Sequence, residues 1–324
     1  MAEWTLSGAL NRALLDAMDE DPRLLVFGED VGRLGGVFRV TDGLQEKFGE
    51  DRVFDTPVAE AGIVGAAIGL ALTGWKSVVE MQFDGFSYPA FEQIVSHVAK
   101  YRNRTRGRVD LPIVIRIPSF GGIRGKEHHG ESPETYFAHT AGLKVVAPSG
   151  ALDGYRLLRL AIDDPDPVVF LEPKARYWAK EEGELSSDDP RLGEARVVRD
   201  GDAAVVFTYG AMLTRCLDAA ESLEGEGIST RVVDLRSLAP LDVPLIGRCA
   251  RETGRVVVVH EAPKTLGLGG EVAARVMEEA FDHLQAPVAR VTGWDVPYPP
   301  AALEAVYLPS VDRIADAIRR VTSY

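Results

Sequence analysis

Glu60 is the residue whose surroundings most clearly suggest chemistry. It stands before twelve uncharged residues, 61–72, in which glycines recur at 62, 65 and 69. A carboxyl group beside so much apolar surface can have a perturbed pKa and take part in proton transfer. The glycines would lie on one side of a helix, where another backbone or a flat ligand can come close. The alternative is that Glu60 only complements the dipole of this helix.

Two further groups of candidate site residues follow predicted strands. Glu29 and Asp30 occupy a glycine-bounded acidic loop after the buried run 24–27. In open α/β sheets ligands sit in such loops, although acidic residues there can equally be turn formers. An aromatic cluster near the end of a second strand is either core or a platform that stacks on a heteroaromatic cofactor. Its members are Phe83, Phe86, Tyr88 and Phe91.

A long glycine-rich loop, residues 119–134, is the third candidate. It contains four glycines and the adjacent pair His128 and His129, with His139 close behind. Long loops of this kind usually carry function or move. Adjacent histidines point in different directions and no H-E-x-x-H spacing is present, so a metal site has little support. Contact between a histidine and a substrate carbonyl or carboxylate is at least as well supported.

The composition limits the classes of protein to which the chain can belong. Its 324 residues indicate two domains, and a hydrophobic share of 46% is ordinary for a globular protein. The net charge of −13 argues against binding to nucleic-acid phosphates and suits a partner with a basic face. Within this acidic chain, the basic loop at 102–108 is at most a local anion site.

The cysteines and the apolar runs indicate where the protein works. Cys216 and Cys249 form no C-x-x-C spacing, which suggests a reducing compartment without a disulfide framework. The first thirty residues are charged throughout, so we expect no signal peptide. Every uncharged apolar run is too short for a membrane span. We therefore expect a cytoplasmic protein.

The elements that must position the candidate residues alternate between strands and helices. Buried apolar runs predict the strands, and apolar residues at helical spacing predict the helices. In the first part of the chain, strands are expected at 24–27, 77–83, 113–117, 143–148 and 167–173, and helices at 5–17, 61–72, 90–101 and 152–162. The turn residues 55–57 provide a start for the helix at 61–72.

A second α/β region follows a predicted linker. Residues 179–190 are acidic and poor in apolar side chains, which indicates a connection between domains. Beyond them, strands are expected at 203–209, 229–235, 255–260 and 288–292, and helices at 213–223, 243–253, 270–284 and 311–321. We therefore predict an α/β protein with two doubly wound domains, residues 1–185 and 186–324. No dinucleotide fingerprint is completed after Gly267 and Gly269, because Val272 stands where the third glycine would be.

Several segments, in this order, resemble the β subunits of heteromeric 2-oxo acid dehydrogenase E1 components. They are LVFGEDVG at 25–32, GGVFR at 35–39, FDTP at 54–57, EAGIVG at 60–65, EMQF at 80–83, HHGESPE at 128–134, HTAGLKVV at 139–146, VDLRSL at 233–238, HEAP at 260–263 and YPP at 298–300. The likeness spans essentially the whole chain. The segment SPE at 132–134 favours the branched-chain type, with pyruvate dehydrogenase as the alternative.

The resemblance implies a transketolase-like fold and thiamine diphosphate as cofactor. The domain at 1–185 would bind the pyrimidine end of the cofactor, and the domain at 186–324 would support dimerisation and docking to the E2 core. In the family, the carboxyl group that matches Glu60 favours the pyrimidine tautomer that removes a proton from the thiazolium carbon. The 2-oxo acid is then decarboxylated, and its acyl group passes to the lipoyl arm of E2. The cofactor performs the carbanion chemistry while the protein orients it.

Further residue roles come from the same resemblance. Phe86 matches the aromatic residue that stacks on the pyrimidine. Val58 and Gln82 match residues of the same pocket, and we add Glu29 to this group of cofactor-binding residues. His129 matches a loop histidine near the substrate and the lipoyl group. The family commonly has Ser-Gln after this histidine, where the present chain has Gly130 and Glu131. This departure bears on the hydrogen bonding of the loop and on acyl preference.

The resemblance also implies partners and metal ions. The family's diphosphate-binding motif begins Gly-Asp-Gly and binds magnesium, and this chain has no Gly-Asp-Gly. An α subunit is therefore expected to supply it, in an α2β2 tetramer. A potassium ion held on backbone carbonyls is also implied, and the matching positions are Leu111, Ile113, Val114, Ala161, Asp164 and Asp166. The alternative from another class is a non-catalytic scaffold that keeps the fold and docks to E2.

Overall fold

The computed structural model describes residues 2–186 and 191–324, which form two compact units. Unit 1 comprises residues 1–119 and 136–192, and unit 2 comprises residues 120–135 and 193–324. The segment 120–135, which carries His128 and His129 and is called the histidine loop below, therefore groups with unit 2 although unit 1 flanks it in sequence. The predicted domain division at residue 185 stays a prediction.

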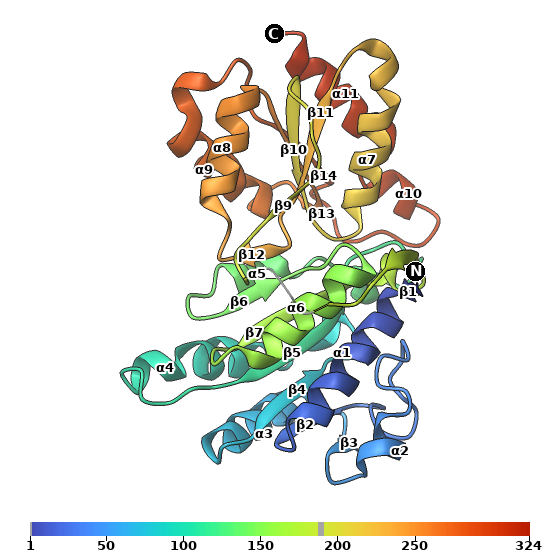
Figure 1. Ribbon diagram of the computed structural model, residues 1–324, viewed down its shortest axis with the longest axis vertical. Helices are drawn as coiled ribbons and strands as arrows, with labels where there is room; N and C mark the ends of the chain where they lie inside the picture. The colour runs from blue at the N-terminus through green and yellow to red at the C-terminus, as the bar shows by residue number, and fades with distance from the viewer. Residues whose placement is uncertain (1, 187–190) are drawn as a thin grey trace. The chain divides into compact units, whose positions relative to one another are not determined.

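Unit 1 is built on a parallel sheet with helices on both faces (Figure 1). Within the unit, its strands follow the order β6-β7-β5-β4-β2-β3. Their bounds are β2 Leu24–Gly28, β3 Val53–Asp55, β4 Lys76–Glu80, β5 Ile113–Ser119, β6 Lys144–Val146 and β7 Val168–Pro173. Nearly every residue of these strands is buried, as expected for a sheet covered on both faces.

The helices of unit 1 lie around this sheet. They are α1 Leu6–Glu20, α2 Leu44–Phe48, α3 Glu60–Leu72, α4 Tyr101–Arg104 and α6 Ala151–Asp163, and α5 Glu134–Ala138 crosses the boundary between the units. Helices α1 and α6 pack on each other and share one core with the sheet. Helix α1 begins where predicted, because the Thr5 side chain accepts a hydrogen bond from the Gly8 amide.

Unit 2 repeats the α/β pattern. Its sheet follows the order β14-β13-β10-β11-β9, parallel except for β9 at one edge. The strands are β9 Arg196–Arg199, β10 Ala204–Thr208, β11 Thr230–Asp234, β13 Val256–Pro263 and β14 Ala289–Gly293, with a short β12 at Ser237–Ala239. Helices α7 Met212–Ser222 and α11 Val311–Thr322 cover one face, and α8 Val243–Thr253 and α9 Leu268–Ala280 cover the other (Figure 1).

Two predictions about regular elements are wrong. The helix predicted at 90–101 is interrupted by a π turn at Gln93–His97, followed by a 3₁₀ turn and α4. The wider turn changes the register, so that Val98 and Ala99 are buried together with Ile94. The linker predicted at 179–190 contains β8 Lys180–Gly183, which pairs antiparallel with β1 Ala2–Thr5. Residues 187–190 lie outside the described part of the chain.

Backbone pairing explains why β8 escaped prediction. Its side chains are charged, and Glu181 accepts a hydrogen bond from the Leu152 amide at the start of α6. Hydrogen bonds and the ion pair between Lys180 and Glu3, rather than apolar burial, therefore order this segment. Among the described residues, no helix is long and apolar enough to cross a membrane.

Candidate functional site

The carboxyl ends of three neighbouring strands bring most of the predicted site residues to one edge of unit 1. Strand β2 pairs in parallel with both β3 and β4, so their carboxyl ends meet. Glu29 directly follows β2, Glu60 is the first residue of the helix after β3, and Gln82 lies two residues beyond β4. This is the edge at which open α/β sheets bind ligands.

Glu29 and Glu60 form an electrostatically coupled pair at this edge. Their exposed fractions are 5% and 7%. Burial raises the pKa of Glu29, and the nearby charges of Glu60 and Asp30 raise it further. The buried Oε1 atom of Glu29 has no hydrogen-bond partner among the described residues. The Glu29 carboxyl group is therefore suited to accepting a hydrogen bond from a ligand at this edge.

The start of α3 differs from the expectation drawn from residues 55–57. The N-cap position is Ala59, and no side chain caps the helix, so the predicted start at 55–57 is wrong. Asp55 instead accepts a hydrogen bond of 2.6 Å from the Gly32 amide. It thereby fixes the loop that carries Glu29, because β3 lies beside β2.

Helix α3 buries one side and exposes a small apolar one. Its buried apolar residues are Ile63, Val64, Ala67 and Ala71. The exposed positions are Ala61, Gly62, Ala66, Gly69 and Leu72. None of these exposed residues is polar, and nothing in the described part of the chain lies within 4 Å of a Cβ built on Gly69. A second backbone can therefore approach this side of the helix closely.

The other predicted residues of this edge, Gln82, Phe86 and Val58, differ in their contacts and in their exposure. Gln82 donates a hydrogen bond of 2.7 Å to Asp30, which fixes its amide beside the acidic loop. Phe86 lies in a 3₁₀ turn at Asp84–Ser87 and is half-buried, with its ring at 81° to that of Phe83. It therefore offers part of a ring to a ligand. Val58 is 80% exposed in this chain.

A buried ion network under this edge was not predicted. Arg116 on β5 donates to Glu80 at the end of β4 and to Glu172 on β7, with distances of 2.6 to 2.9 Å. Tyr177 donates to the same Glu172. A sequence signal exists, since Arg116 interrupts an apolar strand, but the identity of its partners depends on strand order.

A second buried pair supports the turn that carries Phe86. Lys174 contacts Asp84, and both side chains are fully buried. The Ser87 hydroxyl also donates to the Asp84 carbonyl, which closes the turn. The orientation of Phe86 therefore depends on a lysine eighty-eight positions later in the sequence.

The histidine loop places His128 and His129 in a 3₁₀ turn, Glu127–His129. Their ring centroids are 4.2 Å apart, and His129 is the less exposed of the two. The Phe120 amide donates to the Glu131 carbonyl, which closes the base of the loop. His139 belongs to unit 1 and is exposed. No described group of three or more His, Cys, Asp or Glu side chains is arranged to hold a metal ion.

Comparison with known proteins places this architecture in a family. The model of the transketolase pyrimidine-binding domain matches residues 2–179, and that of the transketolase C-terminal domain matches residues 193–314. A 3-methyl-2-oxobutanoate dehydrogenase subunit β from Mycobacterium tuberculosis is 56% identical, over 98% of this chain and 91% of that protein. The pyruvate dehydrogenase E1 component subunit β of Leifsonia xyli is 52% identical, over 98% and 94%.

The chain belongs to the transketolase-like family of E1 β subunits. The predicted resemblance and the predicted α/β fold class are thereby confirmed. A solved split-gene transketolase, described as an inactive β4 tetramer, has a TM-score of 0.81 and 25% identity, with 98% of each chain covered. Transketolase-like E1 proteins depend on thiamine diphosphate, and their β subunits pair with an α subunit.

In this E1 β chain, the residues predicted to hold potassium gather at the opposite edge of the sheet. Leu111 precedes β5, while Asp164 and Asp166 precede β7, so the set lies at the amino ends of strands. Lys144 is within 2.7 Å of both carboxylate oxygens of Asp164, and Asp166 contacts Arg102. Because cations already neutralise both carboxylates, a potassium ion there would depend on backbone carbonyls, and the site stays a prediction.

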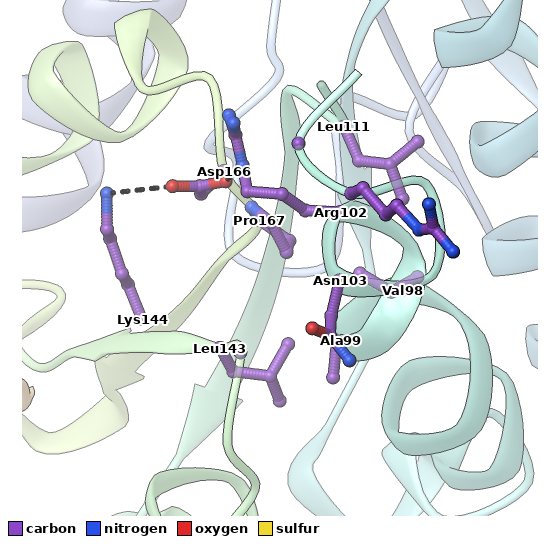
Figure 2. A pocket seen from close by; sticks show the side chains of 12 residues that line it. Val98, Ala99, Arg102, Asn103, Leu111, Leu143, Lys144, Asp166 and Pro167 are labelled. Carbon is purple, nitrogen blue, oxygen red and sulfur yellow. Dashed lines mark hydrogen bonds and ion pairs between the residues drawn. The ribbon is translucent and has the colours of Figure 1, made fainter. Parts of the chain in front are cut away.

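A cavity of about 480 Å³ adjoins these residues. Figure 2 shows Arg102 and Asn103 of α4 on one side and Leu143 and Lys144 on the other, with Asp166 between them. The dashed line in the figure joins Lys144 to Asp166. The cavity lies at the amino ends of the strands and is therefore separate from the edge with Glu29 and Glu60. The basic residues near it are largely paired with aspartates, which leaves little free charge for an anion.

Proposed function

We propose that this chain is the β subunit of a thiamine diphosphate-dependent 2-oxo acid dehydrogenase E1 that acts on branched-chain 2-oxo acids. The observation that carries the proposal is the coupled pair Glu29 and Glu60 at the carboxyl ends of β2 and β3, next to Gln82 and Phe86. The 56% identity to a 3-methyl-2-oxobutanoate dehydrogenase β subunit supports the branched-chain assignment. The 52% identity to a pyruvate dehydrogenase β subunit keeps pyruvate as the second candidate.

The donors and acceptors at this edge fit the pyrimidine end of the cofactor. A buried carboxyl oxygen without a partner, on Glu29, suits a ring with N–H donors. Phe86 offers a half-buried ring for stacking, and the apolar helix α3 excludes water around Glu60. Thiamine diphosphate, when bound, supplies the carbanion that attacks the 2-oxo carbon. In this proposal, Glu60 holds the proton exchanged with the pyrimidine ring, and Gln82 and Val58 border the ring.

His129 is proposed to contact the substrate and the lipoyl group. A histidine on a glycine-rich loop can donate or accept a proton near neutral pH. Its 3₁₀ turn is closed by hydrogen bonds from the His129 amide to Lys126 and from the Gly130 amide to Glu127. The side chain is therefore carried by a folded turn rather than by an extended strand.

An α subunit is proposed to supply the diphosphate and magnesium site, in an α2β2 tetramer. The uncharged exposed side of α3 supports this assembly, because small residues allow a helix of another subunit to pack closely. Docking to E2 is proposed for unit 2. There, Met277 and Phe281 are exposed beside Glu278 and Asp282, which fits a partner that is both apolar and basic.

The test is 2-oxo acid decarboxylation by the complex purified after co-expression with the candidate α subunit. We expect Glu60→Gln to lower the rate by roughly 10²-fold or more, because general acid–base groups contribute about that much. Glu46→Gln, an exposed glutamate on α2, is the matched control and should keep wild-type activity. Wild-type activity of the Glu60→Gln complex would end the role given to Glu60.

Two comparisons complete the test. Rates on 3-methyl-2-oxobutanoate and on pyruvate decide between the two substrates. Activity of this chain without an α subunit would contradict the proposed division of labour. An inactive wild-type complex that still binds E2 would instead favour the scaffold alternative.

A further inference from the structure

The histidine loop is held in unit 2 by three buried glutamates. Glu261 on β13 accepts a hydrogen bond of 2.8 Å from the Gly121 amide. Glu304, the first residue of α10 Glu304–Tyr307, accepts from the Arg124 amide with both oxygens, at 3.0 and 3.3 Å. Glu134, at the end of the loop, accepts a hydrogen bond of 2.6 Å from the Tyr209 hydroxyl. The loop is therefore fixed through its backbone at two points and through a side chain at a third.

Tyr298 packs directly against the loop beside these anchors. Its hydroxyl donates a hydrogen bond of 2.8 Å to Glu304, and its ring is 6% exposed. A Cβ atom on Gly121 would lie 2.1 Å from the Tyr298 hydroxyl oxygen, and one on Gly130 would lie 2.3 Å from the Tyr298 ring. Neither glycine has a left-handed φ. Both positions therefore need glycine for space, and Tyr298 fills that space.

The contact with Tyr298 involves Gly130, the position at which the sequence departs from the family pattern. A serine at this position would place its side chain inside the Tyr298 ring. Gly130 directly follows the turn that carries His129. The contact with Tyr298 is thus one residue away from the histidine.

Backbone strain shows that the loop conformation is imposed from outside. Phe120 and Arg124 have φ values of 71° and 56°, which are unfavourable for residues other than glycine. The Arg124 amide is the group bound by Glu304, and the amide after Phe120 is the group bound by Glu261. Strained residues persist when their surroundings fix them, so the two glutamates stabilise this conformation.

We propose that Tyr298 and Glu304 are positioning residues that hold the histidine loop, and with it His129, in the conformation that acyl transfer requires. Tyr298 fills the space beside Gly121 and Gly130, while Glu304 joins the Tyr298 hydroxyl to the Arg124 amide. The part that concerns acyl transfer rests on the role proposed above for His129. The part that concerns the loop conformation does not.

Trypsin measures the loop conformation independently of activity, because Arg124 and Lys126 are cleavage sites within it. Cleavage of the folded chain at these two bonds is followed by mass spectrometry. Glu304→Ala and Gly130→Ala should increase the cleavage rate about tenfold or more, since each removes or displaces a buried contact. Glu304→Gln keeps an acceptor for Arg124 and for Tyr298, so it should remain within about threefold of wild type.

The matched control is a second tyrosine in the same cluster. Tyr307 is as buried as Tyr298, and their ring centroids are 5.1 Å apart. In the described part of the chain its hydroxyl makes no hydrogen bond to the loop, whereas that of Tyr298 reaches Glu304. Tyr298→Phe should increase cleavage by about tenfold, the effect of losing a hydrogen bond to a charged group, and Tyr307→Phe should not. Equal effects of the two substitutions would overturn the positioning role.

Activity is then measured in the complex with the α subunit. Glu304→Ala should lower the rate of acyl transfer to a lipoyl domain about tenfold, with the KM for thiamine diphosphate unchanged and with recovery in Glu304→Gln. One combination of results would show that the link between loop conformation and acyl transfer is wrong. In that case Glu304→Ala increases loop cleavage but keeps acyl transfer, while His129→Ala loses acyl transfer. If His129→Ala keeps full activity, the proposed role of His129 fails, and with it the part of the inference that concerns acyl transfer.

Discussion

Glu134 is expected to make the stability of unit 2 depend on pH, and Glu134→Gln tests this. The side chain is fully buried, with one oxygen bonded to the Tyr209 hydroxyl and the other without a hydrogen-bond partner among the described residues. Burial raises the pKa of Glu134 from 4.5 to about 7, against the lowering effect of the Tyr209 hydrogen bond. The folded protein therefore holds this proton more tightly than the unfolded chain does.

The direction of the effect follows from this difference. A group with a raised pKa in the folded state stabilises fully below its unfolded value of 4.5, and the stabilisation is lost as the pH rises through about 7. At ~1.4 kcal/mol for each pH unit between the two values, the total loss is about 3 kcal/mol. The glutamine side chain in Glu134→Gln cannot ionise, so the variant does not lose stability in this way as the pH rises. The free energy of unfolding of the variant, relative to wild type, should rise by about 2–3 kcal/mol between about pH 5 and about pH 8.5.

Hydrogen exchange of the amides of β10 gives the opening free energy of unit 2, because this strand lies in the middle of its sheet. The control is Glu221→Gln, which makes the same chemical change at an exposed position on α7. The opening free energy of Glu221→Gln, relative to wild type, should stay constant over the same pH range. The assignment of a raised pKa to Glu134 would be refuted if the opening free energy of Glu134→Gln, relative to wild type, stayed constant or fell as the pH rises.

Two further predictions concern unit 1. Ala66→Arg, on the exposed side of α3, should abolish co-purification with the α subunit while the chain alone unfolds as wild type, whereas Ala274→Arg on α9 should leave assembly intact. Lys174→Met should destabilise the chain by about 3–5 kcal/mol in chemical denaturation, because the buried Asp84 loses its lysine. Adding Asp84→Asn should recover part of this loss, and no recovery would mean that the pair is not coupled.

The sequence predicted most of the longer strands and helices, because burial produces a clear pattern of apolar residues. Strand β7 is apolar up to Glu172 near its end, and α8 lies at the predicted residues 243–253. Elements ordered mainly by hydrogen bonds left no such pattern. Strands β1 and β8 are short and polar, and their pairing joins residues almost 180 positions apart. Local periodicity cannot report a contact of that kind.

The candidate site shows the same limit at the level of side chains. Glu29 and Phe86 follow predicted strands, Glu60 is the one acid beside an uncharged apolar run, and Gln82 was selected through the family resemblance. Strand order then brings the four residues to one edge. The residues that support them could not be selected. Lys174 under Phe86 is recognisable only once β7 is known to lie beside β5.

Buried glutamates serve two purposes in this chain, and the number of hydrogen-bond donors that face each one decides which. Glu304 receives donors from Arg124 and Tyr298, and such a carboxylate acts as a fixed acceptor that shapes the backbone around it. Among the described residues, Glu29 has an oxygen that receives no hydrogen-bond donor and its pKa is raised, and Glu134 shares both properties. A carboxyl group in that situation is stabilised by a proton, or by a ligand that brings donors. Donor count therefore distinguishes Glu304, a fixed acceptor, from Glu29 and Glu134, which are expected to take up a proton, and Glu134 does so while it also anchors the histidine loop through Tyr209.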